Sequence, residues 1–511
     1  RCGSGTVTHR HSLRLHADDN LRIAVTRITK GTVLEEGLVA VAQVPASHKI
    51  AARAIYKGEY LVKYGQPIGV ARIDIAQGDW LHVHNVDPLP EKASDDGEIG
   101  HGAALAPPLD MTTFQGYLRE NGSVGTRNFI GVLTSVNCAA SVADFIASEA
   151  ERCGLLDGYD NIDGIVPLTH GTGCGLSPST EGYSLLERTL WGHAAHPNFA
   201  AILTVGLGCE VFRTEAMLEK HQLKNSQRIH HMTIQEEGGT LATVQRGLDH
   251  LRELLPAANA VQRSVRPASD LKLGLQCGGS DGLSGVTANT ALGIAADLLV
   301  ASGGTAVLSE TPEIFGAEAS LMRRAVSKEV ACALQARVDW WADYAARHGA
   351  RLDNNPSPGN KQGGLTTISE KSLGAVAKSG QAPLSAVIEY AEPIPTRGLI
   401  FMDSPGYDPV SVTGQVGSGC NIVAFTTGRG AAFGSRPVPT IKVASNARLM
   451  SMMSGDMDVG CGDVLDGVPL EHKGQEIFNH ILRVASGAQT ASESLGYGRR
   501  EFVPWQVGAV L

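Results

Sequence analysis

The segment from Leu271 to Ser302 constrains the fold more than any other part of this sequence. Its first five residues are apolar and strand-like, and helical sequence begins near Asn289. Between them lies a loop with four glycines, the thiol of Cys277 and the carboxylate of Asp281. Glycines allow positive φ and a close approach to ligands, and a strand-to-helix turn directs free N–H groups at an anion. The segment therefore predicts an α/β unit whose loop binds a small, oxygen-rich anion.

Strand-like and helical segments alternate from about residue 113 onward. We expect strands at Ile130–Leu133, Ile165–Leu168, Ala201–Val205, Leu271–Leu275, Thr305–Leu308, Gly398–Met402 and Ile422–Thr426. We expect helices at 139–153, 181–192, 239–255, 289–302 and 314–348. This alternation is typical of parallel sheets. The segment Pro256–Ala268 has two prolines and no clear period, and it predicts a boundary between two α/β units.

The first part of the chain has a different pattern. Short strand-like segments such as Leu21–Arg27 and Tyr60–Tyr64 alternate with glycine-containing turns, which predicts a small all-β domain. Residues 87–112 are rich in Pro, Asp, Gly and Ala and predict an extended linker. We thus expect an N-terminal domain at 1–86, a linker at 87–112, a middle α/β domain at 113–260 and a C-terminal domain at 261–511.

Composition excludes several functional classes. The net charge of −9, without a Lys/Arg cluster, argues against a nucleic-acid partner. No apolar run approaches the roughly 20 residues that cross a bilayer, and no signal-peptide pattern is visible. The nine cysteines lack CxxC spacing, which favours reduced thiols. We therefore expect a soluble cytoplasmic protein that binds neither nucleic acid nor membranes.

Four cysteines follow strand-like segments: Cys138, Cys174, Cys209 and Cys277. Enzymes with α/β folds gather ligand groups at the carboxyl ends of strands. A single cysteine at such a place is more often a small buried apolar residue. Four at equivalent positions favour a shared site or a role in metal binding.

The N-terminal domain contributes histidines. In a strand, His82 and His84 would point to the same face. Together with His16 they could form a three-nitrogen metal site or a general-base cluster. Surface or hydrogen-bonded histidines are an equally good interpretation.

Charged side chains of the C-terminal half are further candidates. Glu310 directly follows an apolar strand, whereas Glu313 also fits simple compensation of a helix dipole. Lys361 could bind a carboxylate or take a proton from carbon, and Arg429 offers a fork for a carboxylate. Plain surface charge is the alternative for both cations. No nucleotide-binding motif occurs between a strand and a helix, and no GxSxG nucleophile elbow is present. The sequence therefore disfavours nucleotide binding and a serine hydrolase.

Several long motifs occur in one order along nearly the whole chain. They are His16-Ala17-x-Asp19-Asn20, Lys63-Tyr64-Gly65-x-Pro67-Ile68-Gly69, Asn121-Gly122-x-Val124-Gly125-Thr126-Arg127-Asn128, Gly206-Leu207-Gly208-Cys209-Glu210, the Cys277 loop with Val286-Thr287-Ala288-Asn289, Asn355-Pro356-Ser357-Pro358-Gly359-Asn360-Lys361 and Thr427-Gly428-Arg429-Gly430. Together they resemble the altronate dehydratase and galactarate dehydratase family of sugar-acid hydro-lyases.

This resemblance implies an N-terminal β-clip (SAF-like) domain, a middle domain that can mediate homodimerisation, and a Rossmann-like parallel-sheet domain. It also implies a divalent metal, usually Fe²⁺, with Mn²⁺ or Mg²⁺ as alternatives. Phe315-Gly316-Ala317-Glu318 looks more like the altronate branch. Ala431-Ala432-Phe433-Gly434 stands where those enzymes tend to carry Thr-Pro-Tyr-Gly, so the substrate, an altronate-like aldonate or an aldarate such as galactarate, stays open.

The implied reaction removes water from a 2,3-dihydroxy acid to give a 2-keto-3-deoxy acid. A base takes the C2 proton, an acid protonates the leaving C3 hydroxyl, and a metal stabilises the enolate. The predicted catalytic residues are Lys361, Glu310, His16, His48 and His84. The predicted substrate-binding residues are Ser280, Asn360, Arg429, Gly278, Gly279 and Arg127. The predicted metal ligands are Cys277, Asp281, Glu310, Cys209 and Cys174.

Two alternatives remain at this point. In the first, Cys174, Cys209 and Cys277 hold a [4Fe-4S] cluster with one iron open to the substrate. In the second, the chain is a non-catalytic sugar-acid-binding protein.

Overall fold

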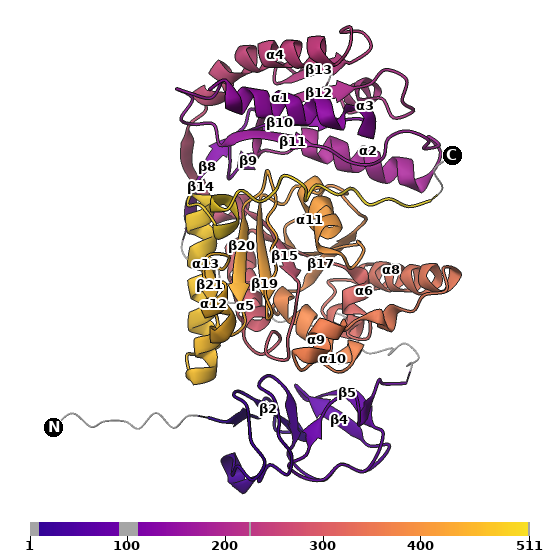
Figure 1. The fold of residues 1–511 in the computed structure, drawn as a ribbon, viewed down its shortest axis with the longest axis vertical. Helices are drawn as coiled ribbons and strands as arrows, with labels where there is room; N and C mark the ends of the chain where they lie inside the picture. Colours follow the sequence, from indigo (N-terminus) through magenta and orange to yellow (C-terminus); the bar gives the residue numbers. More distant parts are fainter. Residues whose placement is uncertain (1–9, 91–110, 224–225, 509–511) are drawn as a thin grey trace, which may run out of the picture.

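A computed structural model describes residues 10–90, 111–223 and 226–508. Three bodies follow one another along the long axis of the molecule: the N-terminal domain, the C-terminal domain and the middle domain, with the C-terminal domain between the other two (Figure 1). Within the described ranges, no helix combines the length and apolar character that a bilayer crossing requires.

The N-terminal domain consists of two small antiparallel sheets, which confirms the predicted β fold. The first sheet contains β1 (Ser12–Leu13), β2 (Leu21–Ala24), β3 (Lys49–Ala51) and β6 (Trp80–Leu81) in that order, and the second contains β4 (Tyr60–Lys63), β5 (Gln66–Ala71) and β7 (Val86–Asp87). The β4–β5 turn consists of Tyr64 and Gly65, with φ of 61° and 68°, the combination that a two-residue hairpin turn requires. Most of the predicted linker, residues 91–110, lies outside the described residues.

The middle domain contains a parallel sheet in the order β11-β10-β12-β13. Its strands are β10 (Phe129–Thr134), β11 (Gly164–Leu168), β12 (Phe199–Gly206) and β13 (Ile229–Thr233). The helices α1 (Ala140–Arg152) and α4 (Thr240–Ala260) pack with one apolar core of this sheet, and α2 (Glu181–Ala194) and α3 (Thr214–Lys220) pack with another. Helix α4 continues past Pro256 into the segment predicted as a boundary. Beyond it, β14 (Arg263–Pro267) pairs with β8 (Thr113–Leu118), which in turn pairs with β9 (Val124–Gly125).

The C-terminal domain contains a seven-stranded parallel sheet in the order β17-β18-β16-β15-β19-β20-β21. The strands are β15 (Lys272–Cys277), β16 (Thr305–Ser309), β17 (Leu384–Ile388), β18 (Gly398–Met402), β19 (Ile422–Thr427), β20 (Thr440–Ala444) and β21 (Val459–Gly460). After β15 the chain first builds one side of the sheet and then the other, so the strand order reverses between β15 and β19. In such sheets, ligands bind outside the carboxyl ends of the strands at this switch point. The Rossmann-like prediction is confirmed.

Helices cover both faces of this sheet. The pair α5 (Ala288–Ala301) and α13 (Leu470–Ala485) packs on one face, and α11 (Asp408–Gly417) packs with a separate core that also contains residues of α2. Further helices are α9 (Pro358–Gln362), α10 (Ile368–Val376), α12 (Ala447–Met452) and α14 (Ala491–Ser494).

The single helix predicted at 314–348 is wrong. The segment contains α6 (Thr311–Ile314), α7 (Glu318–Met322) and α8 (Lys328–Arg347). Gly316, with φ of 85°, ends the first of them. Ala325 forms a bridge with Leu384 of β17, and the Ser327 hydroxyl then caps α8 by accepting a hydrogen bond from Val330 N.

Candidate active site

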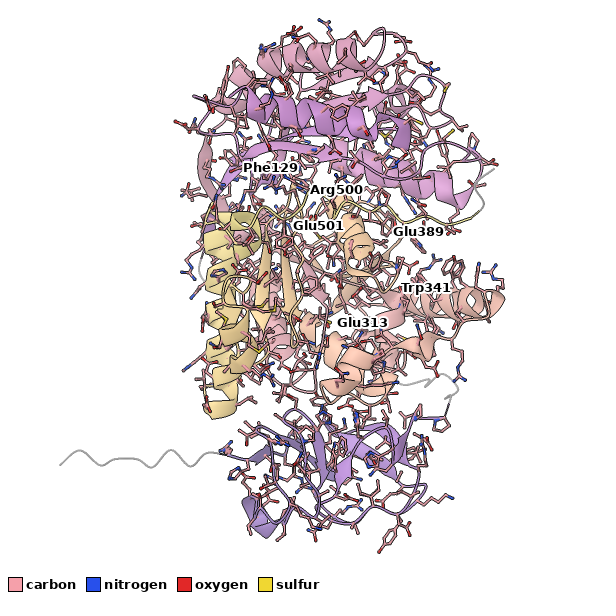
Figure 2. All side chains as sticks on the ribbon, viewed as in Figure 1. Phe129, Glu313, Trp341, Glu389, Arg500 and Glu501 are labelled. Carbon is pink, nitrogen blue, oxygen red and sulfur yellow. The ribbon has the colours of Figure 1, made fainter. Side chains whose placement is uncertain are left out.

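The carboxyl edge of the seven-stranded sheet holds a buried cluster of ionisable side chains. Cys277 ends β15, Glu310 and Glu313 follow β16, and Asp408 begins α11. Figure 2 places Glu313 in the part of the C-terminal domain that faces the N-terminal domain. These groups therefore lie next to the switch point between β15 and β19.

Two lysines of the α10 region supply the positive charge of this cluster. Lys378 Nζ lies 2.8 Å from Cys277 Sγ and 3.0 Å from Glu313 Oε2. Lys371 Nζ lies 3.2 Å from Glu313 Oε1, and both carboxylate oxygens of Glu313 lie 3.4 Å from Cys277 Sγ. The thiol and the carboxylate thus converge on an ammonium group in a place that excludes water.

The two glutamates have opposite protonation tendencies. Burial alone would raise the pKa of Glu313, but Lys378 and Lys371 outweigh it and hold this pKa far below the usual range. Burial, together with the charges of Glu313 and Asp408, raises the pKa of Glu310 well above the ordinary value. The backbone of Glu310 has φ of 71°, an uncommon value for a residue with a side chain, and Ser404 Oγ accepts a hydrogen bond from its N–H. Such strain is concentrated at functional sites.

Asp408 completes the group of carboxylates. Burial and the charge of Glu313 raise its pKa to about 7. A Cβ atom added at Gly278 would lie 2.6 Å from Asp408 Oδ2, so the aspartate is next to the glycine loop. Burial likewise raises the pKa of Cys277 to about 12, which keeps the thiol protonated when no cation is bound.

The N-terminal domain is fastened to this edge by a buried ion triad. Glu370 of α10 accepts hydrogen bonds from Lys49 Nζ at 2.8 Å and from Lys63 Nζ at 2.9 Å. Burial lowers the pKa of Lys49 to about 8, whereas the two lysines overcome the effect of burial on Glu370 and lower its pKa. Lys49 Nζ also donates to Gly364 O at 2.6 Å, and Lys63 Nζ to Gly282 O at 3.3 Å.

Backbone and apolar contacts reinforce the docking. Leu283 and Val286, from the loop after β15, belong to the same apolar core as Leu21, Leu61 and other residues of the N-terminal domain. The Ser47 carbonyl lies so close to Gly282 and Gly364 that neither position has room for a Cβ atom. The first domain is thus seated directly on the loops that carry the candidate site.

Docking brings a group of histidines of the N-terminal domain against α9. The rings of His48, His82 and His84 gather around Trp80, at centroid distances of 5.0 to 5.6 Å from it. His48 Nε2 contacts Gln362 O at 3.1 Å, and Trp80 Nε1 donates to His48 Nδ1 at 3.1 Å. Because both ring nitrogens of His48 are engaged, this histidine positions α9 and has no free nitrogen for proton transfer.

His16, in contrast, is not part of this ring cluster. It is exposed, and its Nδ1 accepts a hydrogen bond from Asp18 N at 3.2 Å beside the turn at Gly65. The predicted set of His16, His82 and His84 does not form a compact three-nitrogen group among the described residues.

The predicted cations lie on α9 and on the loop after β19. Arg429 Nη2 donates to Gln362 Oε1 at 3.3 Å, and Lys361 precedes Gln362 on α9. Among the described residues, neither cation has a carboxylate within ion-pair distance. Asn360 Nδ2 donates to Ser280 O at 2.8 Å, while backbone N–H groups of Gly428 and Arg429 donate to Gly279 O. Of the predicted substrate-binding residues, Gly279, Ser280, Asn360 and Arg429 are thus connected by these hydrogen bonds, and Gly278 precedes Gly279 in the same loop.

Two predicted residues have structural roles instead. The carboxylate of Asp281 is enclosed by four donors: Leu283 N, Ser284 Oγ, Ser445 Oγ and Asn446 Nδ2. These bonds make it an anchor of the loop. The five N–H groups of Arg127 are all used, two of them by Glu493 and three by backbone carbonyls. Arg127 therefore joins the start of the middle domain to the end of the chain and offers no donor to a substrate.

The other strand-end cysteines lie in the middle domain. The loops of Cys138, Cys174 and Cys209 follow β10, β11 and β12 and are connected to one another, for example by Asn137 N donating to Thr172 O at 3.0 Å. All three thiols are exposed, whereas Cys277 is buried in the other sheet. The predicted ligand set of Cys174, Cys209 and Cys277 is thus divided between two domains.

Two cavities lie on the opposite side of the C-terminal domain. They have volumes of about 300 and 260 Å³ and are lined by α1 or the loop after β11 and by the segment around Arg500. Figure 2 shows Arg500 and Glu501 between the middle and C-terminal domains, far from Glu313. Neither cavity contains a member of the buried carboxylate cluster, so the carboxyl edge remains the better candidate.

Comparison with known proteins identifies the family. Residues 10–88 match the altronate/galactarate dehydratase SAF domain, residues 116–259 the second domain of D-galactarate dehydratase/altronate hydrolase, and residues 268–510 the C-terminal domain of D-galactarate/altronate dehydratase. This chain belongs to the galactarate/altronate dehydratase family. The resemblance of its motifs to that family is thereby confirmed.

Individual members of the family are similar over almost their whole length. Altronate dehydratase of Bacillus subtilis is 36% identical over 487 residues, which cover 93% of this chain and 95% of the relative. Altronate dehydratase of Escherichia coli is 33% identical over 518 residues, 98% of this chain and 99% of the relative. Galactarate dehydratase (L-threo-forming) of E. coli is 37% identical over 501 residues, 95% of this chain and 94% of the relative. The identities do not separate the two branches.

Proposed function

We propose that this protein is a hydro-lyase that dehydrates a sugar acid to a 2-keto-3-deoxy acid at the carboxyl edge of its seven-stranded sheet. The observation that carries the proposal is the cluster of Glu310, Glu313, Asp408 and Lys378 in a chain of this family. It places acids, a base and fixed positive charge beside glycine-rich loops. The substrate is a 2,3-dihydroxy aldonate or aldarate.

Arg429 and Lys361 would bind the substrate carboxylate. Neither has a carboxylate partner in the described chain, and a guanidinium pairs with a carboxylate through two parallel hydrogen bonds. The contact of Arg429 with Gln362 holds it beside α9, where Asn360 fixes the glycine loop. This arrangement would direct C2 and C3 of the bound acid towards the buried cluster.

Asp408 is the group best matched to take the C2 proton. Its pKa of about 7 lies near neutral pH, where a base combines a useful ionised fraction with adequate strength. The ammonium groups of Lys371 and Lys378 would stabilise the negative charge that develops on the enolate. His84, exposed beside Trp80, could protonate the leaving C3 hydroxyl, whereas burial lowers the pKa of its neighbour His82 to about 4 and disfavours that ring as an acid.

Part of the cluster suits the divalent metal that the family resemblance implies. Cys277 and Glu313, whose sulfur and carboxylate oxygens lie 3.4 Å apart, would hold it, and Glu310 would have to approach them, because the three residues do not form a compact ligand set among the described residues. A thiolate beside carboxylates favours Fe²⁺ over Mg²⁺. When bound, such an ion acts as a Lewis acid towards the substrate carboxylate and the enolate.

A sugar-acid panel tests the proposal. Purified protein with Fe²⁺ and a reductant should form a 2-keto acid from at least one aldonate or aldarate. Arg429→Gln should raise KM for that substrate more than it lowers kcat, whereas Asp408→Asn should lower kcat. Binding of sugar acids without any turnover would refute the proposal and favour a binding protein.

The iron–sulfur alternative makes a different prediction. A [4Fe-4S] cluster would give anaerobically purified protein a brown colour, which the mononuclear site does not. The location of Cys277 in a different domain from Cys174 and Cys209 disfavours a cluster held by these three thiols. A homodimer and a cytoplasmic location stay predictions from the family resemblance and composition.

A further inference from the structure

The middle domain contains a compact group of metal-ligating side chains that the dehydration chemistry does not use. His230 lies on β13, the edge strand of the sheet, and His250 and Glu253 lie on α4, which packs across it. Within the described ranges, this is the one set of three His, Cys, Asp or Glu residues whose ligand atoms all lie within 4.8 Å of one another. The two histidines come from elements that are distant from the carboxyl edge of the seven-stranded sheet (Figure 1).

We propose that His230, His250 and Glu253 form a binding site for a divalent transition-metal ion such as Zn²⁺. The two histidine Nδ1 atoms are 2.8 Å apart, and Glu253 Oε2 lies 3.3 Å from His250 Nδ1 and 3.9 Å from His230 Nδ1. Ligands about 2.05 Å from a tetrahedral ion are separated by roughly 3.3 Å. The three separations, 2.8, 3.3 and 3.9 Å, scatter around this value, so little movement is needed for all three atoms to contact one ion.

Burial and charge fit three protein ligands with an open fourth position. His250 is largely buried and His230 is half-buried, whereas Glu253 is exposed, with 58% of its side-chain surface accessible. The outer side of the site therefore faces solvent, and water can complete the tetrahedron. The Glu253 carboxylate supplies negative charge, and the nearby Arg246 opposes it in part. Two imidazoles and a carboxylate are a donor set that suits zinc and its neighbours better than Mg²⁺ or Ca²⁺.

The bound ion would fasten an edge strand to a helix. Edge strands have unpaired backbone groups on one side and gain order from any added attachment. A ligand that binds only the folded state also raises the free energy of unfolding. The site is expected to stabilise the middle domain without taking part in the chemistry near Glu313.

Cobalt binding tests this inference in the full-length protein. Chelator-treated protein is titrated with Co²⁺, and the visible bands of four-coordinate cobalt are recorded together with the near-ultraviolet band that thiolate ligands produce. Zn²⁺ competition and thermal unfolding with and without Zn²⁺ complete the measurement. The variants are Glu253→Gln and His230→Gln. The matched control is His231→Gln, because His231 is the next residue on β13 and its ring contacts Thr204 Oγ1 at 2.9 Å instead.

The expected result is a cobalt ion with visible bands but without a thiolate band, displaced by Zn²⁺; a second ion bound at Cys277 would be recognised by its thiolate band. Glu253→Gln and His230→Gln should each weaken binding at least about tenfold, since loss of even a group that only supports a ligand costs 10- to 100-fold. Both variants should lose the Zn²⁺-dependent rise in Tm while His231→Gln keeps it. Equal binding by the wild type and both variants, with each variant folded by circular dichroism, would overturn the proposal. Dehydratase activity of Glu253→Gln should equal that of the wild type, so failure here is distinguishable from failure of the proposed function.

Discussion

Replacement of Glu370 by glutamine should undock the N-terminal domain. The substitution leaves Lys49 and Lys63 with no carboxylate in a place where their side chains are at most 1% exposed. Removal of one partner from a buried ion pair costs about 3–5 kcal/mol, because the remaining charge is uncompensated. At 1.4 kcal/mol per factor of ten, the docking equilibrium would weaken by roughly two to more than three orders of magnitude.

Hydrogen exchange and activity report this change separately. In Glu370→Gln, amides of β3 and β4 and of the loop after β15 should exchange faster, while those of β10 and β12 in the middle domain should not change. Activity should fall, since docking carries the ring cluster around Trp80 to the site. Glu471→Gln, an exposed change at the start of α13, is the control and should cost less than about 1 kcal/mol.

A compensating variant tests the cause. Lys49→Met, Lys63→Met and Glu370→Leu together remove all three charges, and apolar replacement of a buried ion cluster is often neutral or stabilising. This triple variant should regain slow exchange in β3 and β4. If Glu370→Gln alone leaves exchange in these strands unchanged, the triad does not hold the domain and the reasoning is refuted.

Three further predictions concern the site and its surroundings. The pKa of about 7 at Asp408 predicts that kcat/KM falls as the pH drops through 7, because protonation removes the base. In Asp408→Asn this fall at low pH should disappear. A variant with the pH profile of the wild type would exclude Asp408 as the base. Cys277→Ser should lower the affinity for Fe²⁺ at least about tenfold but affect Mg²⁺ binding little, as judged by metal titration, because only the thiol distinguishes these ions. Arg127→Lys should lower the free energy of unfolding by about 1–3 kcal/mol through lost hydrogen bonds and leave KM unchanged, since its donors are all internal.

Most of the strands that the sequence predicted have largely apolar runs. Strand β13 was missed because His230 and His231 interrupt its pattern, and β20 because Lys442 lies in its centre. That lysine is buried, and its ammonium donates to Ala431 O at 3.2 Å and lies over the Tyr497 ring. A partner supplied by tertiary structure cannot be read from local periodicity.

Residues of the candidate site could be predicted only where a reactive side chain lies directly at the end of a predicted strand. Cys277 and Glu310 were found for this reason, whereas Lys378 and Asp408 were missed because helices carry them and only the fold brings them together. Buried lysines next to carboxylates are a weak signal in sequence, since most lysines are on the surface. Asp281 was predicted as a metal ligand because the sequence does not show which groups surround its carboxylate. Two of its four hydrogen-bond donors, Ser445 and Asn446, are more than 160 residues away in the chain.

The carbonyl of Ser47 has a consequence for reading relatives of this protein. It presses on Gly282, where an added Cβ atom would lie 2.0 Å from the Ser47 oxygen. Gly364 meets the same carbonyl, but its φ of 101° favours glycine whatever the space. A chain whose first domain had been lost or moved would therefore be free to carry alanine in place of Gly282 alone. This glycine is an imprint of the seated domain, and its replacement in a homologue would signal that its carboxyl edge is open.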